Sequence, residues 1–353
     1  MKIRLAIIDD DKTYLNRIEL NFNTRYPDKF QISFFTSVEK AIENLKNIRV
    51  DIVLVNYKFR EQILNHDFNA GLAYLVETQD VNIEENTIYK YQKLDLLYKQ
   101  ILNIFSDYSK NVRGVDISED KAILTSFVSF AGGVGCSTLA ASYSKYLAKK
   151  GIKVLYLNLE DDGVSDYFFS GDGKFTFSDV IYSIRSKSAN LPIKLESFLR
   201  VDKSGVQFYS GSKVSLDVRE LTTEDIKNLI NNLNLFDEFE HIVLDMKFSL
   251  EKNILDIYKI TNKIILVSDG EEISNTKIHR GISSLNILEK DDHNQIYPKM
   301  VIMYNKFSNK TGKVLTDLDL KNIGGVPRFE HASLYQITEQ ISDGEHFSNL
   351  LEV

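Results

Sequence analysis

A run of glycines between an apolar strand and a helix constrains this chain more than any other feature. Residues 124–130 have the composition of a buried strand, and residues 138–149 have the apolar period of a helix that Gly151 closes. The loop between them reads Ala131, Gly132, Gly133, Val134, Gly135, Cys136, Ser137 and Thr138. Glycines let backbone N–H groups converge on an anion, and the helix N-terminus adds a favourable dipole. The segment predicts a phosphate-binding loop, the alternative being a glycine-rich turn without a ligand.

Strands and helices alternate along the chain, which predicts parallel sheets with crossover helices. In the N-terminal part, strands are expected at residues 3–8, 30–35, 51–56, 72–76 and 87–91, before a helix at 94–105. After the glycine loop, strands are expected at residues 153–159, 206–209, 241–245, 263–268 and 300–304. A chain of 353 residues exceeds what one hydrophobic core usually organises. We therefore expect two α/β domains, at residues 1–105 and 122–353, with a linker at 106–121, where no apolar period is sustained.

Charge and hydropathy exclude several classes of function. A net charge of −7 opposes wrapping of a phosphate backbone, so nucleic acid is not expected as a partner. No apolar run approaches the ~18 residues of a membrane span, and no cleavable leader precedes the first strand. The single cysteine, Cys136, excludes an internal disulfide. We expect a cytoplasmic protein without an integral membrane segment.

The glycine loop resembles the deviant Walker A loop of the ParA/MinD ATPases, Lys-Gly-Gly-x-Gly-Lys-[Ser/Thr]-Thr. The matching residues are Gly132, Gly133, Gly135, Ser137 and Thr138. Both lysines of the pattern are missing, because Ala131 and Cys136 stand in their places. The resemblance implies a doubly wound P-loop domain in which residues 132–138 bind ATP and the Ser137 hydroxyl binds Mg²⁺. Without the two cations, phosphoryl transfer loses charge stabilisation, so we expect hydrolysis to be slow or absent.

Two later strands continue the resemblance. The strand at 153–159 leads to Glu160, near the place where the family has Asp-x-Asp and this chain has Asn158. Glu160 is either a residue that orients the attacking water or part of a solvated acidic loop. The strand at 241–245 ends in Asp245, in the Walker B arrangement that places a carboxylate near Mg²⁺.

Lys247 replaces the proline that follows the Walker B carboxylate in the family. It either restores some of the missing positive charge or is a solvated surface lysine. Farther along, Asn305 and Lys306 follow the strand at 300–304 and resemble the family's Asn-[Lys/Arg] pair, whose amide reads the adenine edge. Pro327 and Arg328 resemble the segment that lies against the base.

The N-terminal domain resembles a two-component receiver, a flavodoxin-like fold. Asp9 and Asp10 match the Mg²⁺-binding acids, and Lys90 matches the lysine that follows the fifth strand. Asn56 occupies the position of the phospho-accepting aspartate, and an amide cannot form an acyl phosphate. We expect a degenerate receiver that is kept for protein contacts. The alternative is an unrelated small α/β domain with surface acids.

The two domains together resemble the TadZ/CpaE family. The resemblance implies an ATP-binding and Mg²⁺-binding homodimer that serves as a positional scaffold in assembly or polar localisation of Tad (Flp) pili. Its receiver-like domain would contact the pilus machinery or a polar landmark protein. Three other classes of protein remain as alternatives. A partitioning ATPase would need efficient hydrolysis, and a MinD-like membrane ATPase would need a basic C-terminal helix. A response regulator would need an aspartate in place of Asn56.

Overall fold

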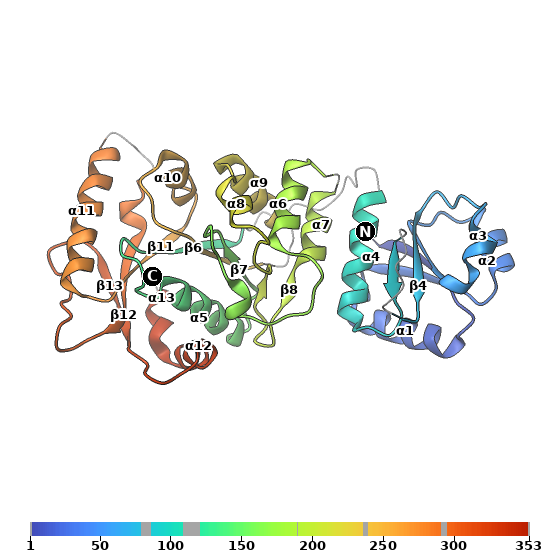
Figure 1. Cartoon of the computed structure of the whole chain (residues 1–353), viewed down its shortest axis with the longest axis horizontal. Helices are drawn as coiled ribbons and strands as arrows, with labels where there is room; N and C mark the ends of the chain where they lie inside the picture. Colours follow the sequence, from blue (N-terminus) through green and yellow to red (C-terminus); the bar gives the residue numbers. More distant parts are fainter. Residues whose placement is uncertain are drawn as a thin grey trace. The chain divides into compact units, whose positions relative to one another are not determined.

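The computed structural model describes residues 2–78, 86–108, 121–188, 190–235, 239–290 and 295–351. The chain divides into two compact units, each with its own sheet (Figure 1). The first unit contains Met1–Ile117 and Ser186–Phe198, and the second contains Ser118–Arg185 and Leu199–Val353.

The first unit is built on a five-stranded parallel sheet of order β2-β1-β3-β4-β5. Its strands are β1 (Ile3–Ile8), β2 (Phe30–Phe35), β3 (Ile52–Asn56), β4 (Gly71–Val76) and β5 (Thr87–Tyr89). Its first four helices are α1 (Lys12–Arg25), α2 (Val38–Leu45), α3 (Arg60–Ile63) and α4 (Leu94–Tyr108). The central strands β1, β3 and β4 are apolar runs that become buried, whereas the edge strands β2 and β5 are buried only in part. Helix α4 continues past Phe105 into the segment predicted as a linker, whose residues 109–120 lie outside the described residues.

One further helix of the first unit comes from much later in the chain. Helix α7 (Leu191–Phe198) packs on α4, and Ile193 lies against the core of this unit. The Glu196 carboxylate accepts hydrogen bonds from the Tyr98 hydroxyl at 2.6 Å and from Lys29 Nζ at 3.3 Å. The sequence prediction had placed these residues in the second domain, so α7 is a correction to its content.

The second unit is built on an eight-stranded sheet of order β13-β12-β11-β6-β10-β7-β9-β8. Its strands are β6 (Ile123–Val128), β7 (Val154–Asn158), β8 (Arg200–Val201), β9 (Gln207–Phe208), β10 (His241–Asp245), β11 (Lys263–Ser268), β12 (Met300–Phe307) and β13 (Lys321–Pro327). All neighbours pair in parallel except β8, which runs antiparallel to β9. Neither β8 nor β13 was predicted. Both are edge strands, with weaker apolar patterns than the buried ones.

The helices of the second unit connect these strands. They are α5 (Cys136–Lys149), α6 (Phe177–Arg185), α8 (Ser215–Arg219), α9 (Thr223–Leu233), α10 (Lys252–Tyr258), α11 (Glu272–Leu288), α12 (Leu334–Asp343) and α13 (Ser348–Leu351). Helix α5 is the most deeply buried part of this set, with Leu139, Tyr143 and Leu147 in the main core. The helix that follows the glycine loop is therefore fixed to the sheet along its length.

A buried lysine joins α5 to α12. Lys145 is fully buried, and its Nζ donates to Glu339 Oε1 at 2.8 Å and to Thr338 Oγ1 at 3.0 Å. Lys149, one turn later, donates to Glu339 Oε2 at 3.0 Å. Because a charge in a core must be paired, Glu339 holds both cations against α12.

We expect Glu339→Ala to destabilise the protein by about 2 kcal/mol, because it leaves the Lys145 cation buried without its carboxylate. Urea denaturation followed by circular dichroism measures the loss. Glu330→Ala is the matched control, since Glu330 is exposed. Equal stabilities of the two variants would contradict a structural role for this ion pair.

Candidate functional site

The glycine loop connects β6 to α5 in the predicted place. Helix α5 begins at Cys136, and Gly135 is its N-cap, with a φ of 84°. Gly133 also has a left-handed φ, of 77°. The Ser129 hydroxyl lies 2.9 Å from the carbonyl oxygens of both Ala131 and Val267, which anchors the start of the loop to β11. The loop has the backbone conformation that only glycines adopt readily.

A cavity of about 530 Å³ opens beside this loop. Its wall consists of residues 129–138 together with Glu160, Met246, Lys247 and Phe248. The volume lies within the range of about 300–1,000 Å³ that is usual for small-molecule sites. The start of α5, where backbone N–H groups are unpaired, forms part of the same wall.

Asp245 lies at the carboxyl end of β10 and is completely buried. Its Oδ2 accepts hydrogen bonds from the Tyr156 hydroxyl at 2.6 Å and from Asn158 Nδ2 at 3.1 Å, because β7 pairs with β10 and places these side chains beside it. Its Oδ1 has no hydrogen-bond partner among the residues that the structure describes. Burial, and then the nearby charge of Glu160, raise the pKa of Asp245 to about 7, and hydrogen bonding to Tyr156 and Ser137 opposes this rise. One oxygen of this buried carboxylate thus lacks a hydrogen-bond donor in the described part of the chain.

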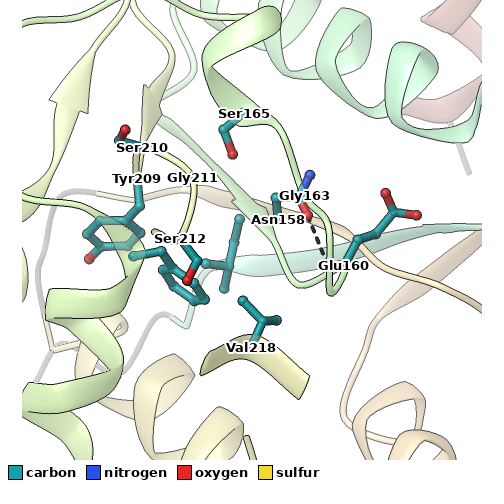
Figure 2. Close-up of a pocket in the computed structure, with 11 residues that line it drawn as sticks. Asn158, Glu160, Gly163, Ser165, Tyr209, Ser210, Gly211, Ser212 and Val218 are labelled. Carbon is teal, nitrogen blue, oxygen red and sulfur yellow. Dashed lines mark hydrogen bonds between the residues drawn. The ribbon is translucent and has the colours of Figure 1, made fainter. Parts of the chain in front are cut away.

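Glu160 lies on the loop after β7 and reaches the start of α5. The Ser137 hydroxyl donates to Glu160 Oε2 at 3.4 Å. Burial raises the pKa of Glu160, and Ser137 and Lys247 oppose that rise. Figure 2 shows a small neighbouring pocket that Glu160 also lines, with its carboxylate pointing away from Tyr209 and Ser212. In the same view the Glu160 backbone N–H donates to Asn158 Oδ1, at 2.9 Å, which fixes the turn.

Ser137 and Glu160 therefore meet in the wall of the cavity, and the Asp245 carboxylate lies close enough to both for each to affect its pKa. A hydroxyl and carboxylates are the oxygen ligands that Mg²⁺ prefers, and a Mg²⁺ site needs few protein ligands when phosphates complete its shell. The described residues contain no cluster of three or more acidic, histidine or cysteine side chains that would hold a metal alone. The residues present fit a Mg²⁺ that arrives with a polyphosphate.

The residues predicted to contact adenine lie behind the loop. Asn305 is buried, and its Nδ2 donates to the Val134 carbonyl at 2.8 Å. Lys306 Nζ donates to the Gly133 carbonyl at 2.9 Å. Pro327 and Arg328 are exposed where β13 ends beside β12. These side chains do not line the cavity, and Asn305 and Lys306 support the loop. A role in binding the base stays a prediction for all four residues.

Cys136 is the first residue of α5 and occupies a place where the ordinary P-loop has lysine. A helix N-terminus lowers the pKa of a thiol. Here burial, together with the charges of Asp245 and Glu160, raises the pKa of Cys136 well above its usual value. This shift favours the neutral thiol, and a thiol supplies no positive charge to the loop in either protonation state.

The four predicted receiver residues meet at the carboxyl edge of the first sheet. Asp9 Oδ2 lies 2.8 Å from Lys90 Nζ and accepts a hydrogen bond from Asn56 Nδ2 at 3.1 Å, and all three side chains are buried. Asp10 is paired with Lys58, a residue that the sequence analysis did not single out. Internal lysines thus neutralise both acids that a receiver uses for Mg²⁺.

We expect Asn56→Asp to destabilise the first unit by about 2 kcal/mol, because it replaces a hydrogen-bond donor beside the buried Asp9 by a second carboxylate. Thermal unfolding measures the change, with the exposed Asn23→Asp as control. An Asn56→Asp variant as stable as the wild type would show that the Lys90 amine neutralises two carboxylates.

Comparison with known proteins supports this arrangement. Residues 1–106 match the family model described as the TadZ-like receiver domain. The crystal structure of a ParA family ATPase from Chlorobium tepidum TLS is 15% identical with a TM-score of 0.52, and the match covers 66% of this chain and 98% of that chain. Residues 1–106 thus belong to the TadZ-like receiver domain family.

Two other solved structures match with lower TM-scores. A plasmid partition protein from Borrelia burgdorferi is 14% identical with a TM-score of 0.48, covering 66% of this chain and 100% of its own. MinD from Aquifex aeolicus is 17% identical with a TM-score of 0.45, covering 66% of this chain and 98% of its own. No curated protein matches at a significant level.

The chain thus has a TadZ-like receiver domain followed by a domain with the fold of a ParA family ATPase, as the sequence predicted. Within the part of the chain that the structure describes, none of the helices is long and apolar enough to span a bilayer. Sequence reasoning missed Tyr156, Ser129 and Lys58. Each is an ordinary residue in its own segment, and its role depends on a partner on another strand or loop.

Proposed function

We propose that this TadZ/CpaE-like protein binds ATP with Mg²⁺ in its second domain and serves as a positional scaffold in Tad pilus assembly. The observation that supports it most is the buried Oδ1 of Asp245, which lies near Ser137 and has no hydrogen-bond partner among the described residues. A buried carboxylate oxygen without a partner is costly, and a bound cation removes that cost. The second domain also shares its fold with a protein that is described as a ParA family ATPase.

The loop and the three oxygen-bearing side chains have distinct roles in this proposal. The backbone N–H groups of residues 132–138 bind the phosphates. Ser137 and Asp245 would hold Mg²⁺, which supplies charge neutralisation between the phosphates. Glu160 keeps its carboxylate at the Ser137 hydroxyl, where it can orient water.

Turnover is expected to be slow or absent. The two lysine positions of the family's loop hold Ala131, which is buried, and Cys136, whose thiol is neutral. Phosphoryl transfer depends on positive charge placed where negative charge develops. ATP would then act as a structural ligand that stabilises the domain and a homodimer, while the receiver-like domain binds a pilus component or a polar landmark protein.

Calorimetry with ATP and Mg²⁺, followed by phosphate release on the same sample over several hours, tests the proposal. Binding in the micromolar range with negligible release is the expected result. Absence of binding would overturn the nucleotide mechanism, whereas brisk release would favour the partitioning ATPase as the function.

A further inference from the structure

Lys247 lies two residues after the end of β10, and its backbone is tied to the core by a hydrogen bond. Its carbonyl accepts a hydrogen bond from the buried Tyr258 hydroxyl at 3.0 Å. The next residue, Phe248, stacks on Tyr258 with a ring separation of 5.5 Å and contacts Phe130 at 4.2 Å. Met246, on the other side, is buried. Because both neighbours are fixed in the core, the exposed Lys247 side chain is held at the cavity wall.

The cavity wall contains few charged side chains. Among the described residues that line it, Lys247 is the one cationic side chain and Glu160 the one carboxylate, with Asp245 behind them. Lys247 lies close enough to Glu160 to lower the pKa of that carboxyl. Within the described part of the chain, no acidic group lies within 4.0 Å of Lys247 Nζ. Its ammonium group is available for an anion.

The other lysine beside the loop is placed differently. Lys306 Nζ donates to the Gly133 carbonyl, on the side where Asn305 contacts the Val134 carbonyl. It does not line the cavity. Lys306 therefore supports the loop conformation, and Lys247 faces the space that a ligand would fill.

We infer that Lys247 replaces the missing loop lysines as the cation that binds the terminal phosphates of the nucleotide. The inference rests on the proposed function. Lysine binds phosphate as a compact point charge, which requires proximity and little directional fit. Glu160 and Ser137 mark the end of the cavity where Mg²⁺ and the terminal phosphates belong, and Lys247 lies near Glu160. Lys247 thus acts from the segment that follows β10 instead of from the loop.

The test compares ATP and ADP affinities of the full-length chain by calorimetry with Mg²⁺. Lys247→Gln is expected to bind ATP about tenfold more weakly, the loss of one charge-assisted contact, and to bind ADP about twofold more weakly or less. Lys247→Arg should restore ATP affinity to within about threefold, because it keeps the charge. Lys252→Gln is the matched control, since Lys252 is exposed on α10 and lines none of the described cavities.

Each outcome has one meaning. A selective loss of ATP affinity in Lys247→Gln, with unchanged thermal stability without nucleotide, supports the inference. Equal ATP affinities of the wild type, Lys247→Gln and Lys252→Gln would overturn it and leave the proposed function standing. A wild type that binds neither nucleotide would overturn both. An equal loss for ATP and ADP would show that Lys247 shapes the site without recognising the terminal phosphate.

Discussion

Asp245→Asn is expected to stabilise the nucleotide-free protein at pH 8 and to abolish its stabilisation by Mg²⁺ and ATP. Asp245 is fully buried, and its pKa is raised from 3.8 to about 7, first by burial and then by the charge of Glu160. At pH 8 the wild type therefore holds a buried anion with one unpaired oxygen. The asparagine keeps the shape and the acceptor for Tyr156 and removes the charge.

The sign of the pH dependence follows from the direction of this shift. The folded protein holds the Asp245 proton more tightly than the unfolded chain, so this contribution to stability is complete below about pH 3.8 and is lost as the pH rises to about 7. A rise of ~3 units corresponds to about 4 kcal/mol as an upper limit. The difference in unfolding free energy between the wild type and Asp245→Asn should therefore grow from pH 4 to pH 7 and stay constant above it.

With Mg²⁺ and ATP bound, the charged Asp245 carboxylate is expected to stabilise the protein instead of destabilising it. The cation needs the carboxylate, and a neutral amide is a much weaker ligand, so the thermal shift that Mg²⁺ and ATP cause in the wild type should vanish in Asp245→Asn. Asp256→Asn, a change on the surface of α10, is the control and should keep that shift. If Asp245→Asn were less stable than the wild type at pH 8 and still responded to Mg²⁺ and ATP, the carboxylate would be a structural acceptor of hydrogen bonds.

The buried parallel strands of both sheets could be predicted because they are continuous apolar runs. The segment at 241–245 is an example, since its five residues are all buried as β10 between β6 and β7. Helix α7 could not be placed in the same way. Its sequence shows a short helix, but nothing in residues 191–198 says that Glu196 pairs with Tyr98 and Lys29 of the first unit. Long-range partners of this kind are not encoded in a local period.

In the candidate site, too, some features follow from local sequence patterns and others depend on contacts between distant segments. The loop and Asp245 were predictable because a glycine run before a helix, and a carboxylate after a strand, are local patterns. The partners of Asp245 were not, because the Tyr156 hydroxyl and the Asn158 amide reach it through the register of β7 and β10. Asn305 shows the limit of the resemblance, since its amide bonds to a carbonyl of the loop. The family pattern identifies which residue is of interest, but the atom that its side chain contacts depends on how the chain packs.

Gly135→Ala is expected to destabilise the second unit by about 3 kcal/mol and to weaken ATP binding at least about tenfold. Two independent effects add at this residue. A φ of 84° is unfavourable for any side chain with a Cβ, and the new Cβ would lie 2.3 Å from Asn305 Nδ2. Asn305 must then move away from the Val134 carbonyl, which leaves that buried oxygen without its donor. Urea denaturation and calorimetry with ATP measure the two losses.

The loop contains its own graded controls. At Gly132, a Cβ would meet no atom within 4 Å and the φ is not left-handed, so Gly132→Ala should leave the stability unchanged. At Gly133 the Cβ is equally free but φ is 77°, so Gly133→Ala should cost the backbone strain alone, about 1–2 kcal/mol. A series in which Gly133→Ala and Gly135→Ala cost the same would show that Asn305 adapts without loss. Contact between Asn305 and the loop would then not explain why glycine is needed at the start of α5.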